Sequence, residues 1–522
     1  MKANRTLNHR VLSLFALVAF CAAPAFAAPQ SPPQRRRRRP VPQEKKKDAD
    51  KPGDKKADAG KKEEPKKKPE AKKSEVTAIV GGDINTVTNG TIRRGTILVE
   101  DGKITALGQD IEVPKGATVI DAKGHVVTPG FISINSSNLG VQVSASSASK
   151  PEDSLNPFDP NVRMALGVGI TTAYVTRGGG RGGFGRSPAA TEEKFLGLDP
   201  ELTEAERLGY NEDFGNPDTA LCPCCGLPIL STAPLTRPKP SPMAEQAHAV
   251  VKMSVGEVDG MFLTKSAFFH VNSGSLTGRL NRHKWRQTIA AAKLYIKELA
   301  EHEAKVKAGD KKAKAPKKPV SDAIMKLVKK EISMRVGSST ASGMREMIAL
   351  AKELDYRLVI DQATEGWVVA DDLVEANVGV IYTPRSLRNP TLGKETSTGS
   401  YIAASGVFEE AGVQFAISPM GNSISLMGLA GRDLTSLPLE AAFVVRGGAS
   451  EKTALDSITI TPARMLGLDD RIGSLEVGKD ADILLLNGNP LDYRTYVETA
   501  LVNGRVAYNR TKDKVFPVYD RN

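Results

Sequence analysis

Histidine is scarce in this chain, and its distribution is one-sided. The 522 residues include six histidines, and none follows His302. Imidazole binds zinc-type ions readily, and hydroxyl or amide side chains do not replace it as strong ligands. A metal site built on histidine therefore cannot draw on any residue beyond His302. The six are His9, His125, His248, His270, His283 and His302.

Long apolar runs are missing after the N-terminus. Residues 1–27 have the layout of an export signal, with a basic start, an apolar stretch and a small-x-small cleavage site before Ala28. We therefore expect an exported protein, periplasmic or extracellular, with no transmembrane span once the signal is removed. A lipid anchor on Cys21 is the alternative, but the bulky Phe20 before it does not fit a lipidation site.

Aromatic residues are absent from 28–74, a low-complexity segment rich in Lys, Arg and Pro. Such a segment has little to bury, so we expect a disordered basic linker. Of the net charge of +12, the signal carries +3 and residues 28–74 carry +10 (18 Lys/Arg against 8 Asp/Glu), which leaves residues 75–522 near −1. Without aromatic or groove-fitting elements, the linker predicts no specific nucleic-acid binding. It is either a solvated tether or a weak contact to anionic envelope components.

Cysteine is limited to four residues, three of them clustered in an insertion at about 178–245. The spacing Cys222-Pro-x-Cys225-Gly is that of a zinc knuckle, in which two sulfurs converge under a tight turn. Zinc needs four ligands, so His248 or a second chain would have to complete the site. An oxidising compartment favours a disulfide of Cys222 with Cys224 or Cys225, leaving a third thiol free or intermolecular. Redox catalysis is the third alternative.

The periodicity of apolar residues changes along the chain. From 75 to 128, short alternating strands are separated by tight turns, and the dipeptide Asp101-Gly102 predicts a hairpin. After Gly130, apolar strand-like runs alternate with helical segments, one of which takes its N-cap from 338–340. Such alternation favours a parallel sheet closed as a barrel. We therefore predict an α/β fold, a TIM-like (β/α)8 barrel with a small β-sandwich.

The stretch 126–137, VVTPGFISINSS, joins these two parts. A Thr-Pro-Gly turn separates two short strands, because proline presets φ and glycine tolerates positive φ. Side chains on a strand repeat every second residue. We therefore expect Ser133, Asn135 and Ser137 to share one face of the second strand.

This stretch resembles the start of the barrel in the metal-dependent amidohydrolase superfamily, where a Pro-Gly-(Phe/Leu)-Ile turn leads into Asp-x-His-x-His. Residues 454–492 and 500–508 resemble the closing segment of that superfamily. The imidazolonepropionase-like amidohydrolases are nearest in pattern. The resemblance implies a composite β-sandwich from both ends of the mature chain, 75–128 and 469–516, around a barrel at 129–468 with insertions at about 178–245 and 300–330.

The resemblance also assigns six positions to residues of the metal site, and none of the six carries an imidazole or a carboxylate here. In the family, zinc or another divalent ion activates the water that cleaves a C–N bond. We therefore expect no catalytic metal and no other cofactor. The six are Ser133 at the Asp position, Asn135 and Ser137 at the first-strand histidines, Gly337 and Gln362 at the histidines of the fifth and sixth strands, and Met420, within one residue, at the eighth-strand Asp.

Four charged or titratable side chains are alternatives. Asp361 and Glu365 flank Gln362, and one of them facing the barrel mouth would be a ligand contact. Lys252 is similar in setting to the carboxylated lysine of some amidohydrolases, although a lone lysine on a strand more often faces a barrel end. His270 is more simply interpreted as an ordinary hydrogen-bonded histidine than as a residue of the mouth.

These expectations favour a degenerate amidohydrolase, a pseudoenzyme that keeps the barrel and binds a small ligand or a protein partner. Two alternatives remain. One is an active hydrolase of C–N bonds with a non-standard site. The other is an envelope-associated structural protein that uses the basic linker. The ligand, the catalytic residues and the oligomeric state stay open.

Overall fold

The fold is given by a computed structural model. It describes residues 76–143, 151–176, 247–271, 276, 278–309, 314–424 and 433–515. The predicted signal at 1–27, the predicted linker at 28–74, and Cys222, Cys224 and Cys225 of the predicted insertion lie outside these residues.

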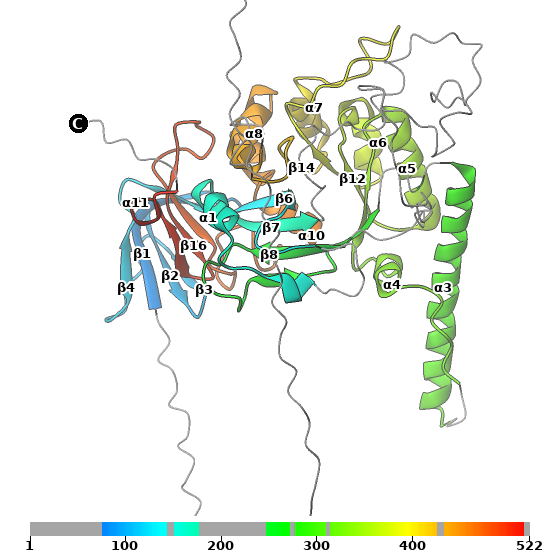
Figure 1. Cartoon of the computed structure of the whole chain (residues 1–522), viewed down its shortest axis with the longest axis horizontal. Coiled ribbons are helices and arrows are strands. Elements are labelled where there is room, and N and C mark those ends of the chain that lie inside the picture. Colours follow the sequence, from blue (N-terminus) through cyan, green and yellow to red (C-terminus); the bar gives the residue numbers. More distant parts are fainter. Residues whose placement is uncertain are drawn as a thin grey trace, which may run out of the picture. The chain divides into compact units, whose positions relative to one another are not determined.

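An eight-stranded sheet joins the two ends of the described chain (Figure 1). The strands run in the order β17-β16-β15-β5-β1-β2-β3, and β4 pairs with β1. Strand β15 lies antiparallel to β5, so that Ile483 faces Pro129. This pairing confirms the composite β domain built from both ends of the chain. The strands are β1 (Val76–Asn85), β2 (Thr91–Glu100), β3 (Lys103–Gly108), β4 (Thr118–Asp121), β5 (Val126–Pro129), β15 (Ile483–Leu486), β16 (Val497–Val502) and β17 (Arg505–Asn509).

The hairpin between β2 and β3 turns at Asp101 and Gly102, as expected. Their φ angles of +50° and +78° are those of a type I′ turn. A side chain on Gly102 would lie 2.9 Å from the carbonyl oxygen of Asn503, so the turn also needs glycine for close approach of the C-terminal strands. The core under this sheet is aliphatic and combines both ends of the chain, including Ile79, Ile97, Val127, Ile483, Leu485 and Leu501.

Two further sheets form the TIM-like barrel. The parallel sheet β10-β11-β12-β13-β14 is accompanied by the sheet β6-β7-β8-β9. Strand β8 runs antiparallel to β7, unlike the strands of a regular (β/α)8 barrel. Ser457 and Ile458 lie between β14 and β6, because the amide of Ile417 donates to the carbonyl of Ser457 and the amide of Ile132 donates to that of Ile458. The strands are β6 (Phe131–Ser137), β7 (Ile170–Thr176), β8 (His248–Lys252), β9 (Phe262–Thr264), β10 (Phe268–Val271), β11 (Ser333–Gly337), β12 (Leu358–Asp361), β13 (Gly379–Tyr382) and β14 (Phe415–Ile417).

Helices follow the barrel strands, and α5 shows how local sequence sets their ends. Thr340 is its N-cap, and the hydroxyl accepts from the amide of Gly343 at 3.2 Å. The helix buries Met344, Met347 and Ile348 at helical spacing. The helices are α1 (Pro160–Gly167), α3 (Arg279–Lys307), α4 (Asp322–Val328), α5 (Ala341–Leu354), α6 (Ala370–Glu375), α7 (Ala404–Ala411), α8 (Leu437–Arg446), α9 (Glu451–Asp456), α10 (Ile460–Leu466) and α11 (Arg510–Asp513), with 3-10 turns at Pro151–Ser154, Gly366–Val369 and Leu434–Ser436.

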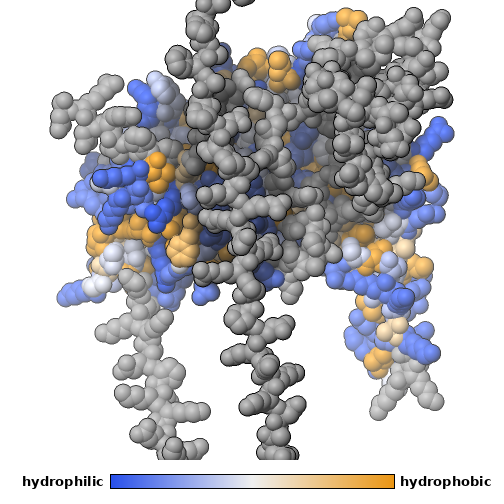
Figure 2. All heavy atoms as spheres, viewed as in Figure 1, coloured by the Kyte–Doolittle hydropathy of each residue, from blue (hydrophilic) through white to orange (hydrophobic). Residues whose placement is uncertain are grey.

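Helix α3 is the longest, with 29 residues, and only part of it is packed (Figure 1). Trp285, Ile289 and Ala292 are buried, whereas Leu294 and Val306 are exposed among basic residues. Figure 2 shows this mixture of apolar and polar surface along the helix. Within the described part of the chain, no helix is long and apolar enough to cross a membrane.

Candidate functional site

The first-strand residues of the expected site lie on β6, and a β-bulge interrupts their alternation. The register between β6 and β7 shifts between Ser133 and Ser136. Ser133 is buried, and its hydroxyl donates to the carbonyl of Asn135 at 3.2 Å. Ser137 contacts the loop after β14, where its amide donates to the carbonyl of Asn422 at 2.6 Å. The hydroxyls of Ser136 and Ser137 also donate within the chain, to the carbonyls of Tyr174 and Asn422.

The other expected positions lie at or just after the carboxyl ends of barrel strands. We call the carboxyl ends of β6, β11, β12 and β14 the barrel mouth. Gly337 ends β11 and is half-buried. Gln362 follows β12, is exposed, and has φ +57°, a conformation that costs about 1 kcal/mol for a residue other than glycine. Met420 is 61% exposed in the loop after β14. The mouth thus carries neutral side chains at these positions.

A buried ion pair between Arg335 and Asp361 occupies the barrel interior. Arg335 has no exposed surface, and its Nε and Nη2 lie 3.0 Å and 2.5 Å from Oδ2 of Asp361. Its Nη1 donates to the carbonyl of Ile134 at 2.7 Å. The guanidinium also lies 4.7 Å from the ring centre of Tyr174 and 5.7 Å from that of Phe268. Strands β6, β7, β10 and β12 therefore surround this one cation of β11.

Two imidazoles lie beside this pair. The Tyr174 hydroxyl is 2.9 Å from Nδ1 of His270, and the Tyr174 ring is 5.0 Å from that of His248. Burial, together with the charges of Arg335 and His248, lowers the pKa of His270 to about 2. His270 is therefore a neutral, hydrogen-bonded histidine of the barrel interior at physiological pH.

The two carboxylates that flank Gln362 both have partners. Asp361 accepts from Arg335, as described. Glu365 is buried, and its Oε2 accepts from the amide of Ala341 at the start of α5 at 2.9 Å. Its Oε1 accepts from Gly399 at 2.7 Å and from Arg388 at 2.9 Å. Burial alone would raise the pKa of Glu365, but these hydrogen bonds outweigh it and hold the pKa below its usual value.

Lys252 lies away from the mouth, against the composite β domain. It is fully buried, and its Nζ is 2.8 Å from Asp480, 3.0 Å from Asp482 and 2.6 Å from Oδ1 of Asn503. Burial by itself would raise the pKa of Asp480, but Lys252, Lys103 and Arg471 outweigh it and lower the pKa to about 2. Lys252 therefore connects β8 to the closing segment of the chain.

The residues at the mouth do not match the donor set of a zinc-type ion. Hydroxyl, amide and thioether groups stand where imidazole and carboxylate would be needed, and a guanidinium already binds the carboxylate of Asp361. Among the residues that the structure describes, no three His, Cys, Asp or Glu side chains converge to hold a metal. The cysteine cluster, with its zinc and disulfide alternatives, lies outside them.

Sequence reasoning identified Asp361 as a candidate but missed Arg335. A signal was present in the strand SMRVG, where the charged Arg335 lies between the apolar residues Met334 and Val336. A charged side chain inside a buried strand requires a partner. The partner on β12 could not be read from the local sequence.

The sequence and the fold are similar to those of known proteins. Residues 396–512 match the model of the amidohydrolase family. The solved structure of an amidohydrolase from Thermotoga maritima MSB8 superimposes with a TM-score of 0.53 and 20% identity, over 83% of this chain and 100% of that one. This similarity supports the fold.

Curated relatives match over short segments. A dihydroorotase from Mycobacterium tuberculosis is 46% identical over 46 residues, which is 9% of this chain and 11% of the dihydroorotase. A 5'-deoxyadenosine deaminase from Methanosarcina mazei is 52% identical over 44 residues, 8% of this chain and 10% of the deaminase. The chain thus spans about a tenth of the length of these relatives.

Proposed function

We propose that this chain, whose residues 396–512 match the amidohydrolase family and whose fold resembles that of a solved amidohydrolase, is a metal-independent member of that family that has lost C–N bond hydrolysis and acts by binding. The observation that carries this proposal is the buried pair of Arg335 and Asp361. It fills the barrel interior with a neutralised ion pair, in which Arg335 occupies the carboxylate nearest to the expected metal site.

Electrostatics argues against a divalent ion in the same space. Arg335 already neutralises Asp361, so this pair offers a divalent ion no net negative charge. The neutral side chains of Asn135, Ser137 and Gln362 offer none either, and nothing at these positions compensates the desolvation of the ion. One restored imidazole would not overcome this cost.

We infer that a small uncharged molecule or a protein partner binds at the neutral mouth, where Gln362 and Met420 are exposed. We also propose that residues 1–27 direct export of the chain and that residues 28–74 contact anionic envelope components. Both proposals rest on the sequence of the N-terminal segment.

Elemental analysis of the purified mature chain, with a panel of amides, lactams and esters in the presence of added zinc or manganese, tests the proposal. We expect well below one metal ion per chain and no metal-dependent turnover. A variant with Cys222→Ser, Cys224→Ser and Cys225→Ser separates a cysteine-bound ion from one in the barrel. Stoichiometric metal in that variant, together with metal-dependent turnover, would contradict the proposal. Turnover that does not depend on metal would favour an active hydrolase with a non-standard site.

A further inference from the structure

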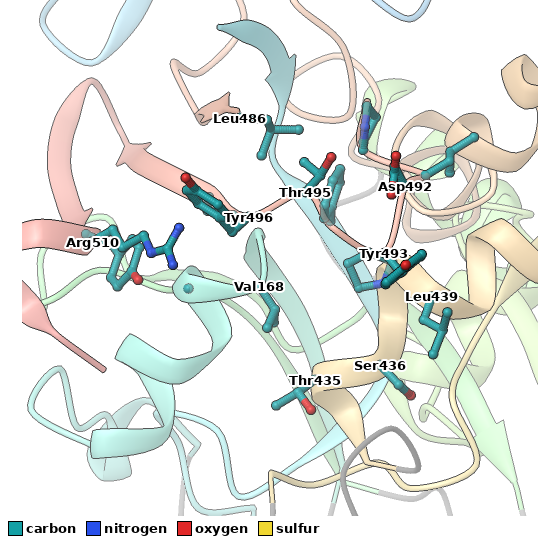
Figure 3. Close-up of a pocket in the computed structure, with 17 residues that line it drawn as sticks. Val168, Thr435, Ser436, Leu439, Leu486, Asp492, Tyr493, Thr495, Tyr496 and Arg510 are labelled. Carbon is teal, nitrogen blue, oxygen red and sulfur yellow. The ribbon is translucent and has the colours of Figure 1, made fainter. Parts of the chain in front are cut away.

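A pocket of about 320 Å³ lies apart from the barrel mouth. Phe131, the first residue of β6, lines it, whereas Ser137 of the mouth lies at the other end of the same strand. Its walls come from α1, the start of α8, the loop 487–496 and the closing strands (Figure 3). Its volume is in the range of small-molecule sites.

The pocket has an aromatic ring on each of two sides, and one of these sides also carries a cation (Figure 3). In Figure 3, Tyr496 and Arg510 lie on one side, and Tyr493, Leu439 and Ser436 lie on the other. Tyr493 is 84% exposed and Tyr496 39% exposed, so neither side chain is fully covered by the rest of the chain. Apolar and aromatic side chains with a few placed polar groups are typical of small-molecule sites, and aromatic rings stack with other rings.

Arg510 supplies an unneutralised cation at this pocket. Its guanidinium carbon lies 3.3 Å from the ring centre of Tyr496. Stacking uses the face of the guanidinium and leaves its in-plane N–H groups able to donate to a carboxylate. No carboxylate of the described residues forms an ion pair with Arg510.

The nearby acidic residues are engaged elsewhere. Asp492, which also lines the pocket, is bound by Nε and Nη2 of Arg494. Asp513 lies 3.5 Å from Arg163 and accepts from the amide of Asn509. The charge of Arg510 is therefore available to a ligand.

We propose that this pocket binds a small planar aromatic carboxylate. The ring lies against Tyr493 and Tyr496, and the carboxylate accepts two hydrogen bonds from Arg510. The site does not depend on the barrel mouth or on the loss of the metal, so it is independent of the function proposed above.

Calorimetric titration of the mature chain with three probes of equal ring size tests the assignment: 2-naphthoate, 2-naphthol and 2-naphthylmethylammonium. We expect 2-naphthoate to bind at least tenfold more tightly than 2-naphthol and the cation not to bind. Arg510→Gln should lower the affinity for 2-naphthoate about tenfold and leave that for 2-naphthol unchanged. Tyr493→Ala should weaken both.

Two further variants make the outcome specific. Lys512→Gln removes an exposed charge of the same helix that does not line the pocket, and it should bind 2-naphthoate like the parent chain. Arg510→Lys keeps the charge but not the planar fork, and it should bind with intermediate affinity. Circular dichroism melts confirm that each variant is folded. Equal binding of 2-naphthoate and 2-naphthol, or equal losses in Arg510→Gln and Lys512→Gln, would overturn the proposal.

Discussion

Arg335 lies on the buried strand β11 and makes its only ion pair within the described chain with Asp361. Taking both charges out of water carries a desolvation cost that the pair must offset. Three donated hydrogen bonds and two aromatic faces satisfy the guanidinium. The net attraction of such a pair adds little to the free energy of unfolding, whereas the removal of one partner lowers it strongly.

Asp361→Ala should therefore lower the free energy of unfolding by about 3 to 5 kcal/mol, because it leaves a buried guanidinium without a counter-charge. Denaturant unfolding measures this loss. The double variant Arg335→Met with Asp361→Leu removes both charges and should be much closer to the parent. Asp372→Ala is the matched control, because it breaks an exposed pair with Arg345 and should cost about 1 kcal/mol or less. Equal losses in Asp361→Ala and Asp372→Ala would contradict the prediction.

His270 should make the folded state sensitive to mild acid. Its pKa is lowered to about 2 in the fold, so below about pH 6.5 the unfolded chain binds a proton that the folded chain does not. Keeping His270 neutral costs the folded state nothing above about pH 6.5. Below that pH, the free energy of unfolding falls by about 1.4 kcal/mol per pH unit. The charges that face the ring are those of Arg335 and His248.

Unfolding free energies at pH 7 and pH 5 test this dependence. His270→Gln should lose roughly 2 kcal/mol less than the parent over this interval. His283→Gln, on the exposed face of α3, serves as the comparison and should follow the parent. A parallel loss in the parent and in His270→Gln would show that His270 does not titrate as proposed.

At the scale of elements, the sequence predicted what depends on local pattern. The Asp101-Gly102 hairpin and the Thr340 cap of α5 require only the residues around them. The antiparallel direction of β8 was not predicted, because a long insertion separates it from β7 and any direction is sterically open. The bulge near Ser133 was missed because it depends on pairing with β7.

Glu365 connects the start of α5 to the loop between β13 and α7, and its removal should loosen that loop. It accepts from the first residue of α5 and from Arg388 and Gly399 in the loop between β13 and α7. Glu365→Ala should cost about 2 to 3 kcal/mol and speed proteolytic cleavage of this loop. Limited proteolysis followed by mass spectrometry locates the cuts. Glu375→Ala, an exposed pair with Lys352, should leave the cleavage pattern unchanged.

At the scale of the whole molecule, the composite domain was predictable because 126–137 and 454–508 resemble the opening and the closing segments of one family. The pairing of β5 with β15 follows from that resemblance and from no local pattern. Contacts that join the composite domain to the barrel were not predicted. Lys252 looked like a residue of a barrel end, and only the fold brings Asp480 and Asp482 to it.

Lys252→Met should uncouple the barrel from the composite domain. It leaves Asp482 buried with no cation among the described residues, while Asp480 keeps Lys103 and Arg471. We expect a loss of about 3 kcal/mol in the free energy of unfolding. Lys252→Met with Asp482→Asn should recover much of it. Lys352→Met, which breaks an exposed pair with Glu375, is the control and should cost about 1 kcal/mol or less.

The same network has a pH signature with a defined sign. The pKa of Asp480 is about 2 in the fold and near 3.8 in the unfolded chain, so its contribution is complete above about pH 4 and is lost as the pH falls through 2. Without Lys252 the folded pKa should rise, and this part of the acid sensitivity should shrink. Unfolding curves of the parent and of Lys252→Met between pH 5 and pH 2 measure the difference. An equal dependence in both chains would mean that Lys252 does not hold Asp480 ionised, and that its link to the closing segment is packing alone.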